Sequence, residues 1–296
     1  MSIVMGSPVW EVQGVDVSKW NGNMNFAVTK TKCQYGLARY GYGDGWKDPK
    51  IDEYYTGANA NDFPLGGYWF NYIGKDLNAH AQGFAEEIRN HPPKVGIRLD
   101  FEWTSLGMQD TLDWMIALDK KVTQLTGLIA EVYSAIWFWD SKVAPTTYFS
   151  GRMNWPANWT TRDYPSLPRG WTKWGDWQFS ADGNRKGAEY GSTNGDADMD
   201  LNRSFYTVVQ FNAKYGTHIV PIGGTPPPPP GTLPPYVIIN TAELAIHSTP
   251  QAVQTNIIGH ALQGSKWYPL EEVVSGISWY RLANGAYISK GYTKYP

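Results

Sequence analysis

An unbroken run of prolines, Pro226–Pro230, constrains this 296-residue chain more than any other feature. Proline lacks a backbone N–H and fixes its φ angle, so consecutive prolines form an extended rod that joins neither a helix nor a sheet. Glycine, threonine and further prolines flank the run. We therefore predict a large domain at 1–220, a proline-rich linker at 221–235 and a small domain at 236–296. A proline-rich ligand for an SH3 domain is the alternative interpretation of the run.

The large domain alternates short apolar segments with amphipathic ones. Strands are predicted at 14–17, 35–40, 65–70, 95–101, 129–133 and 177–179. Helices are predicted at 78–90 and 110–123, where apolar residues recur at helical spacing. Such alternation over about 210 residues is typical of an α/β fold with a parallel barrel, whose active site lies at the carboxyl ends of its strands.

The small domain reads as a succession of short β-rich segments separated by glycine, asparagine and serine. Strands are predicted at 236–239, 257–259, 266–270, 278–282 and 286–288. This spacing is typical of a small all-β barrel. The segment contains no acid pair and no histidine cluster, so we interpret it, by elimination, as a binding module.

Charge and hydropathy exclude several classes of partner. The net charge is -2, charged residues make up 18% and no Lys/Arg run stands out, so neither nucleic acid nor an anionic membrane surface is expected as a partner. No apolar run approaches the roughly 20 residues of a membrane span, so we expect no membrane insertion. The first residues lack a basic start followed by an apolar core, and we expect no signal peptide.

Cysteine and histidine supply no recognisable site. Cys33 is the single cysteine, so no internal disulfide can form, which fits synthesis in a reducing cytosol. A thiol nucleophile is the functional alternative, but no active-site motif surrounds Cys33. The five histidines lack the spacing of metal ligands. We expect no metal and no cofactor.

Aromatic residues are unusually abundant, with 15 Trp and 19 Tyr. Such rings stack on the apolar faces of sugars while their N–H and O–H groups reach hydroxyls. One run is denser than a single core layer usually needs and contains Trp155, Trp159, Trp171, Trp174 and Trp177. We therefore expect carbohydrate to be the substrate or ligand.

Two carboxylates, Asp100 and Glu102, stand two positions apart at the end of the apolar strand at 95–101. Side chains at i and i+2 of a strand share a face, so these acids repel each other and at least one pKa rises. A paired carboxyl group with a raised pKa is the usual preparation for general acid catalysis, and paired carboxylates cleave glycosidic bonds. A solvated strand end is the alternative interpretation.

Further acids fall at other predicted strand ends. Asp16 ends the first strand, and Asp196, Asp198 and Asp200 lie near the end of the barrel segment. If a barrel closes between its first and last strands, Asp16 and the later acids come together.

The ordered set of motifs resembles glycoside hydrolase family 25, the muramidases called Chalaropsis-type lysozymes. The resemblance covers roughly residues 10–212 and depends on short motifs at 15–18, 20–22, 67–70, 99–102, 132–134, 177–179 and 200–202. Each motif is unspecific alone, but their shared order is not. The resemblance implies a flattened, irregular TIM-like barrel of eight strands with fewer helices than a full (β/α)₈ barrel.

The resemblance also implies roles for particular residues. Glu102 matches the general acid that protonates the leaving glycosidic oxygen. Asp100 matches the carboxylate that assists the substrate's N-acetyl group or stabilises the oxocarbenium-like centre. Asp16 and Asp200 match the flanking acids that tune this pair. The expected substrate-binding residues are the aromatic side chains within the matching motifs: Tyr68, Trp69, Phe70, Tyr133 and Trp177.

One departure from the family falls after the second strand. The family has a Lys-x-Thr/Ser-Glu-Gly type motif there, whereas this chain has the sequence Ala38-Arg39-Tyr40-Gly41-Tyr42-Gly43-Asp44-Gly45. We expect the acid to be missing or displaced to Asp44. The small domain resembles bacterial SH3-like cell-wall-binding modules through Leu244–Pro250 and the segment Trp279–Leu282.

These expectations combine into a modular peptidoglycan hydrolase that cleaves the β-1,4 bond between N-acetylmuramic acid and N-acetylglucosamine. Its partner is bacterial peptidoglycan. A phage endolysin is expected to stay in the host cytoplasm until it passes a holin pore and reaches the cell wall. An autolysin, or a non-catalytic wall-binding protein with the same fold, is the alternative.

Overall fold

The computed structural model describes residues 10–160, 162, 164–181, 186–194, 198–222, 237–251, 256–267, 269–275, 277–282 and 286–294. The chain divides into two compact units, Met1–Ile222 and Gly223–Pro296. Most of the predicted linker at 221–235 lies outside the described residues.

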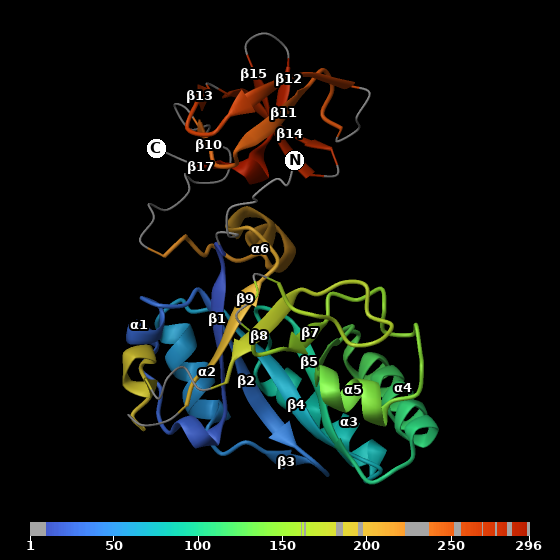
Figure 1. The fold of residues 1–296 in the computed structure, drawn as a ribbon. Helices are drawn as coiled ribbons and strands as arrows, with labels where there is room; N and C mark the ends of the chain where they lie inside the picture. Colours follow the sequence, from blue (N-terminus) through green and yellow to red (C-terminus); the bar gives the residue numbers. More distant parts are fainter. Residues whose placement is uncertain are drawn as a thin grey trace. The chain divides into compact units, whose positions relative to one another are not determined.

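The first unit is an α/β barrel of eight strands (Figure 1). These strands are β1 (Gln13–Val17), β2 (Tyr35–Tyr42), β4 (Leu65–Ile73), β5 (Ile97–Thr104), β6 (Glu131–Ala135), β7 (Trp155–Ala157), β8 (Asp176–Ser180) and β9 (Asp200–Ser204). Strand β1 pairs with both β2 and β9, which closes the sheet. The short strand β3 (Trp46–Lys47) pairs only with β2 at the margin of this sheet.

The barrel is not fully parallel, and here the prediction needs correction. Strand β9 runs antiparallel to both of its neighbours, β1 and β8, while the other pairs around the barrel are parallel. The amino end of β9 therefore lies at the edge where the other strands have their carboxyl ends. Asp200, the first residue of β9, is directly opposite Asp16 in the β1–β9 register.

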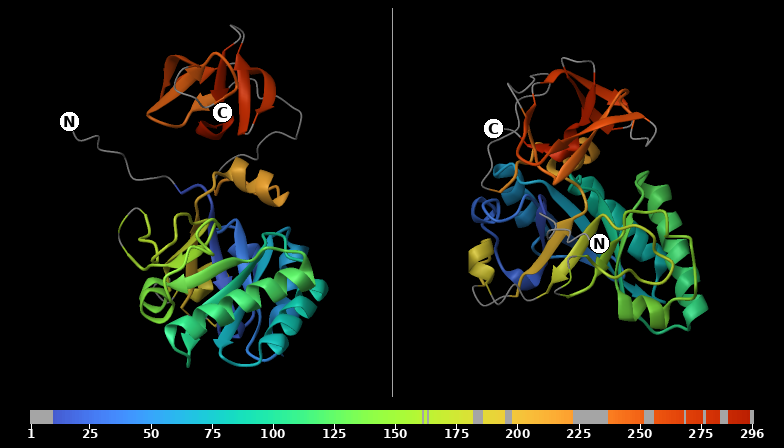
Figure 2. Two further views of the ribbon diagram at one scale, coloured as in Figure 1. Left: turned by 90° about the vertical axis from the view of Figure 1, so that its right-hand side faces the viewer. Right: turned by 45° about the horizontal axis from the view of Figure 1, so that its top comes forward.

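Helices α3 (Leu77–Asn90), α4 (Met108–Thr126) and α5 (Ile136–Lys142) pack outside β4, β5 and β6 (Figures 1 and 2). The predicted helices at 78–90 and 110–123 are thereby confirmed. Asp76 caps α3 by accepting hydrogen bonds from two backbone N–H groups of its first turn, and α4 ends where Gly127 adopts φ +72°. The remaining helices of this unit are η1 (Lys19–Asn21), α1 (Phe26–Thr29), α2 (Ile51–Ala60), η3 (Gly187–Tyr190) and α6 (Val208–Tyr215).

Aromatic rings take the place of a helix outside β8. In the described parts of the two connections between β7 and β9, the only helix is the short η3. Trp177 of β8 packs instead against Trp10 and Trp174, at centroid distances of 6.0 and 6.4 Å. Four of the five tryptophans in the dense run are buried, and only Trp159 is exposed. Most of that run therefore packs the fold, contrary to the carbohydrate-binding interpretation.

The barrel strands alternate between two environments. On β5, Leu99 and Phe101 belong to the core under the helices, whereas Arg98, Asp100 and Glu102 share the opposite, barrel-facing side. The barrel interior is thus lined by charged groups in successive levels along one strand. The level around Arg98 lies toward the amino ends of the strands, and the level around Asp100 and Glu102 lies toward their carboxyl ends.

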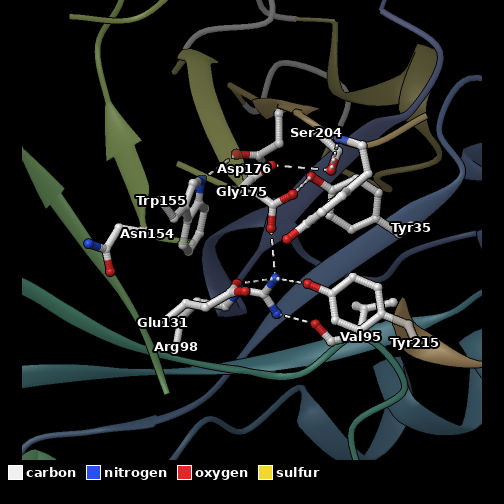
Figure 3. A network of polar contacts seen from close by, with 12 residues as sticks. Tyr35, Val95, Arg98, Glu131, Asn154, Trp155, Gly175, Asp176, Ser204 and Tyr215 are labelled. Atoms are coloured by element: carbon white, nitrogen blue, oxygen red, sulfur yellow. Dashed lines mark hydrogen bonds and ion pairs between the residues drawn. The ribbon is translucent and has the colours of Figure 1, made fainter. Parts of the chain in front are cut away.

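Arg98 is fully buried among ion-pair and hydrogen-bond partners (Figure 3). Its Nη2 lies 2.7 Å from Asp176 Oδ2 and 2.8 Å from Glu131 Oε2. Tyr35 donates to the other oxygen of Asp176 at 2.8 Å, and Lys214 lies 2.6 Å from the other oxygen of Glu131. Two acids and two cations are therefore matched at this level of the barrel.

In its described residues the second unit is built from β-strands and one short helix, in line with the prediction of a small β domain. One sheet has the order β13-β10-β17 and another has the order β12-β11-β16-β15-β14. Their bounds are β10 (Val237–Ile239), β11 (Glu243–His247), β12 (Ile257–Leu262), β13 (Lys266–Trp267), β14 (Pro269–Ser275), β15 (Ile277–Leu282), β16 (Tyr287–Ser289) and β17 (Thr293–Lys294), with the short helix η5 (Lys290–Tyr292). The unit has its own apolar core, which includes Val237, Ile246, Tyr280 and Ile288. Its likeness to SH3 domains stays a prediction.

Candidate active site

Four acids gather at the carboxyl edge of the barrel. Asp16 is the next-to-last residue of β1, Asp100 and Glu102 are the fourth and sixth of the eight residues of β5, and Asp200 begins β9. Asp16 and Asp100 are only 4% exposed, and Glu102 and Asp200 are partly buried. The ionisation of each of the four carboxyl groups is influenced by at least one of the others. The structure therefore brings together all four predicted catalytic residues.

Asp16 and Asp200 form a carboxyl pair that is connected by a hydrogen bond. Burial raises the pKa of Asp16 to about 6, although hydrogen bonds from Asn202 and Gln178 oppose the rise. Burial together with the charge of Asp16 raises the pKa of Asp200 to about 9. Near neutral pH, Asp200 is consequently the protonated donor and Asp16 the anionic acceptor.

Asp100 and Glu102 form the second pair. Burial raises the pKa of Asp100 well above its usual range, and the charge of Glu102 adds to the rise. Burial, with the charge of Asp16, raises the pKa of Glu102 to about 7. This pair therefore holds a proton near neutral pH, as general acid catalysis requires. Asp100 Oδ1 is buried and has no hydrogen-bond partner among the residues that the structure describes.

Two amide side chains hold Asp16 in place. Asn202 Nδ2 donates to Asp16 Oδ2 at 2.7 Å, and Gln178 Nε2 donates to the same oxygen at 3.1 Å. Trp155 Nε1 donates to Asn202 Oδ1 at 2.7 Å. Tyr133 Oη donates to Gln178 Oε1 at 3.0 Å. The indole N–H of Trp155 can only donate, so the Asn202 amide must present its N–H groups to Asp16, and the Gln178 amide presents its own in the same way.

Comparison with known proteins agrees with this geometry. The sequence profile of Glycosyl hydrolases family 25 matches residues 15–188. The chain belongs to this family. It is a glycoside hydrolase. Among relatives, Lysozyme M1 of Streptomyces globisporus is 24% identical over 203 residues, covering 64% of this chain and 67% of the relative. The N,O-diacetylmuramidase of Arthroderma benhamiae is 26% identical over 200 residues, covering 64% of this chain and 84% of the relative.

The fold is also found in solved structures. The bacterial lysozyme from Streptomyces coelicolor superposes with a TM-score of 0.59 at 21% identity. The match covers 71% of this chain and the whole of that one. At this level of identity the likeness establishes the shared barrel fold.

The five aromatic residues that were predicted to bind substrate lie on two different sides of their strands: some face the barrel interior and others face away from it. Tyr68 and Tyr133 line the barrel interior next to the acids, and Phe70, on the same face of β4 as Tyr68, is partly exposed. The prediction is wrong for Trp69, which is 1% exposed and donates its indole N–H to the carbonyl of Gly43. It is also wrong for Trp177, which is 0% exposed and donates to the carbonyl of Asn158. Both point away from the barrel interior and cannot touch a sugar.

Exposed tryptophans surround the carboxyl edge, and of these the sequence analysis singled out only Trp159, as part of the dense run. Trp20 follows β1, Trp103 lies at the end of β5, Trp137 follows β6 and Trp159 follows β7. Trp103 packs edge-on against Tyr72 of β4 at 5.7 Å. These rings could have been recognised from their position in the sequence, because each lies within a few residues of the carboxyl end of a strand. A barrel binds its substrate at that end of its strands.

Gln178 and Asn202 were also missed, although both lie in the motifs that carry the family resemblance. Each is two residues from an interior acid on its own strand, Asp176 or Asp200. The two-residue period of a strand places each amide on the barrel-facing side.

The family's acid after β2 was expected to be missing or displaced to Asp44, and the structure excludes the displacement to Asp44. Asp44 is exposed and lies 3.2 Å from His80 Nδ1, so it does not replace the family's acid at the site. The buried acid next to Arg39 is Asp48, whose Oδ2 accepts a bond from Arg39 Nε at 2.8 Å. Asp48 also accepts bonds from the backbone N–H groups of Lys19 and Lys50. Arg39 in turn lowers the pKa of Asp100, against the larger effects of burial and of Glu102.

Two kinds of feature are absent from the residues that the structure describes. Among them, no group of three or more His, Cys, Asp or Glu side chains is arranged to hold a metal ion. No helix in these parts of the chain is long and apolar enough to cross a membrane.

Proposed function

We propose that the protein is a modular peptidoglycan hydrolase, an endolysin, that cleaves the β-1,4 bond between N-acetylmuramic acid and N-acetylglucosamine. The observation that carries this proposal is the gathering of Asp16, Asp100, Glu102 and Asp200 at the carboxyl edge of a family 25 barrel. The names of the relatives, a lysozyme and an N,O-diacetylmuramidase, support the same substrate class.

The first step uses the proton that the Asp100–Glu102 pair holds. Glu102, with a pKa of about 7, donates it to the glycosidic oxygen as the bond from that oxygen to C1 of the muramic acid breaks. The carbonyl oxygen of the substrate's own N-acetyl group attacks C1 and closes a five-membered ring. Asp100 Oδ1 lacks a protein partner among the described residues and is the acceptor that we assign to the amide N–H of this group.

The second step restores the enzyme. Water attacks C1 from the face that the leaving sugar vacated, the ring opens, and the Glu102 carboxylate takes the proton from water. Two inversions at C1 return the original configuration. We therefore expect retention, which proton NMR of the fresh product would show as the β anomer.

The second unit supports a targeting role. Its own apolar core allows it to fold separately from the barrel. Anchoring to the wall would raise the local concentration of the barrel at its substrate without altering the chemistry. In the same proposal, the enzyme stays in the host cytoplasm until a holin pore admits it to the wall.

The deciding experiment digests purified bacterial walls with the full chain and analyses the new reducing ends. Borohydride reduction of the products converts reducing muramic acid to muramitol. A muramidase yields muramitol, a glucosaminidase yields reduced glucosamine, and an amidase or peptidase yields neither. Absence of muramitol from walls that the wild-type protein visibly degrades would overturn the bond assignment.

The modular part of the proposal needs a separate test. A chain that ends after Pro221 should keep its activity on soluble muropeptide oligomers and lose lysis of intact cells. Residues 236–296 fused to a fluorescent protein should label the walls of the target bacterium. Equal loss of activity on soluble substrate, or a fusion that binds no wall preparation, would contradict the division into catalytic and targeting parts.

A further inference from the structure

We propose that Trp159 and Gln178 form a positioning pair that keeps Asp16 anionic during catalysis. Trp159 Nε1 donates to Gln178 Oε1 at 3.2 Å, and Gln178 Nε2 donates to both oxygens of Asp16 at 3.1 and 3.3 Å. A tryptophan on the surface is thus two hydrogen bonds away from a buried acid of the site. This inference rests on the proposed function.

The position of Trp159 is fixed by the strand on which Gln178 lies. Its neighbour Asn158 donates its backbone N–H to the carbonyl of Gln178 at 3.1 Å. The carbonyl of Asn158 accepts the indole N–H of Trp177 at 2.8 Å. Ala157, the last residue of β7, pairs with Gln178 in the register of β8. These contacts hold the indole N–H of Trp159 inward while 64% of the residue stays exposed.

The indole decides the orientation of the Gln178 amide. Tyr133 Oη also donates to Gln178 Oε1, but a hydroxyl can rotate and accept a bond instead. The indole N–H can only donate, so it is compatible with a single amide orientation. In that orientation the NH₂ group faces Asp16. Without the indole, the amide can turn its oxygen toward Asp16, which would repel the anion.

The charged surroundings of Asp16 make this orientation matter. Asp200 of β9 and Asp100 and Glu102 of β5 face it, together with the hydroxyls of Tyr68 on β4 and Tyr133 on β6. Arg39 of β2, a cation whose charge acts on Asp100 and Tyr68, is engaged in an ion pair with Asp48. Hydrogen bonds from Gln178 and Asn202 therefore supply the stabilisation of the Asp16 anion that no paired cation supplies.

The Asp16 anion has two effects on the reaction. It accepts the proton of Asp200, and its charge raises the pKa of Glu102 so that Glu102 is protonated before the first step. Loss of the Gln178 donor would raise the pKa of Asp16, because the anion loses a hydrogen bond. The acidic limb of the rate profile then moves to higher pH. Once Asp16 is neutral, the pKa of Glu102 falls and the alkaline limb moves to lower pH.

The experiment compares Trp159→Phe and Gln178→Met with the wild type on soluble muropeptide oligomers as a function of pH. Phenylalanine keeps a ring but has no N–H, and methionine keeps the volume of glutamine but has no donor. We expect Gln178→Met to move the acidic limb of kcat upward by about one pH unit and Trp159→Phe by about half of that. KM should change less than twofold in Trp159→Phe, since its effect passes through Asp16.

Two matched controls separate this role from simple packing. Trp114→Phe removes an indole N–H bond, to the carbonyl of Lys75 at 3.1 Å, on the outside of α4. Gln34→Met removes a buried amide with two backbone partners at the amino end of β2. Both controls should lower Tm and leave the pH profile unshifted.

A double variant tests the order of the chain of contacts. If Trp159 acts through Gln178, then Trp159→Phe combined with Gln178→Met has the profile of Gln178→Met alone. Additive shifts, or a Trp159→Phe profile that coincides with the wild type, would overturn the inference.

A titration separates this inference from the proposed function. Carbon-13 NMR of protein labelled at aspartate carboxyl groups, with the Asp16 signal assigned by its loss in Asp16→Asn, follows the pKa of Asp16 without any substrate. The pKa should rise in Gln178→Met and, by less, in Trp159→Phe. An unchanged pKa overturns the inference even in an active enzyme, and wild-type inactivity on walls with a shifted pKa overturns only the proposed function.

Discussion

Buried acids are paired with cations at one level of the barrel interior and left without paired cations at another. At the level of Arg98, the carboxylates of Asp176 and Glu131 are matched by the side chains of Arg98 and Lys214. At the level of the active site, Asp16, Asp100, Glu102 and Asp200 face one another, and the adjacent Arg39 is occupied by Asp48. Strands β5, β6 and β8 contribute to both levels, so the contrast arises over one or two pleats.

This difference shows how a fold can keep protons on acids at neutral pH. Ion pairs such as those of Arg98 with Asp176 and Glu131 stabilise the charged forms of buried acids. Acids that are buried together without cations have raised pKa values, to about 7 for Glu102 and about 9 for Asp200. The matched level links β5, β6 and β8 across the barrel interior, and the unmatched level supplies the acid chemistry. Each prediction below substitutes a residue at one of these two levels or next to it.

The largest effect is expected from Glu102→Gln, which removes the transferable proton of the unmatched level and keeps its shape. General acid catalysis contributes a factor of about 10² to 10⁴, so kcat on soluble muropeptides should fall by at least that much. Circular dichroism should show an unchanged fold, and the exposed Glu86→Gln is the control. Near-normal turnover by folded Glu102→Gln would remove Glu102 from its role.

Removal of Arg98 from the matched level should lower the stability of the first unit rather than impair its catalytic step. Arg98→Met leaves two buried acids with less compensation, and the free energy of unfolding should fall by about 3 to 5 kcal/mol. Scanning calorimetry of the first unit measures this change. Adding Asp176→Asn should recover part of the loss. If Arg98→Met leaves the transition unchanged, this level does not hold the barrel together.

The unmatched level should make the first unit less stable as pH rises. The folded pKa values of Asp16, Glu102 and Asp200, at about 6, 7 and 9, lie above those of the unfolded chain, near 4. The folded state then binds more protons, so stability falls between about pH 4 and pH 9. Asp200→Asn should stabilise the unit by about 1 to 3 kcal/mol at the alkaline end and have little effect at the acid end. If the free energy of unfolding depends on pH in the same way in Asp200→Asn and in the wild type, Asp200 does not hold the proton that we assign to it.

The smallest effect is expected from a substitution of Asp198, two residues before Asp200. Asp198 is exposed, and its recorded contact is a backbone carbonyl that accepts a bond from Asn21. Asp198→Asn should change kcat less than twofold and stability by less than about 0.5 kcal/mol. Asp200→Asn should reduce turnover more. A reversed order would mean that the residues of β9 are shifted by one pleat relative to β1.

Local patterns in the sequence were sufficient for the Asp100–Glu102 pair and for helices α3 and α4. The two-residue period of β5 and the helical spacing of apolar residues are properties of short segments. Strand β9 was not predicted because its sequence, Asp200–Ser204, contains no apolar run. Strand β7 has only three residues. Both depend on pairing with distant strands.

The errors at the site have the same origin. Trp69 lies between Tyr68 and Phe70 on β4, so the strand period itself assigns it to the opposite face. The roles of Gln178 and Asn202 depend on the register of three strands and cannot be derived from any one of them. The antiparallel direction of β9 reverses which end of that strand meets Asp16. Knowledge of sheet order, rather than of composition, was the missing information.

The pairing of β1 with β9 also completes the active site from opposite ends of the catalytic unit's sequence. Asn202 and Asp16, 186 positions apart, meet only when the last strand enters the sheet. A contact of such sequence separation forms late, because most of the chain must be synthesised and ordered before it can close. A growing chain that has emerged only as far as α5 already carries Asp100 and Glu102 but lacks Gln178, Asn202 and Asp200. The four-acid site is therefore complete only when β9 pairs with β1 and closes the barrel.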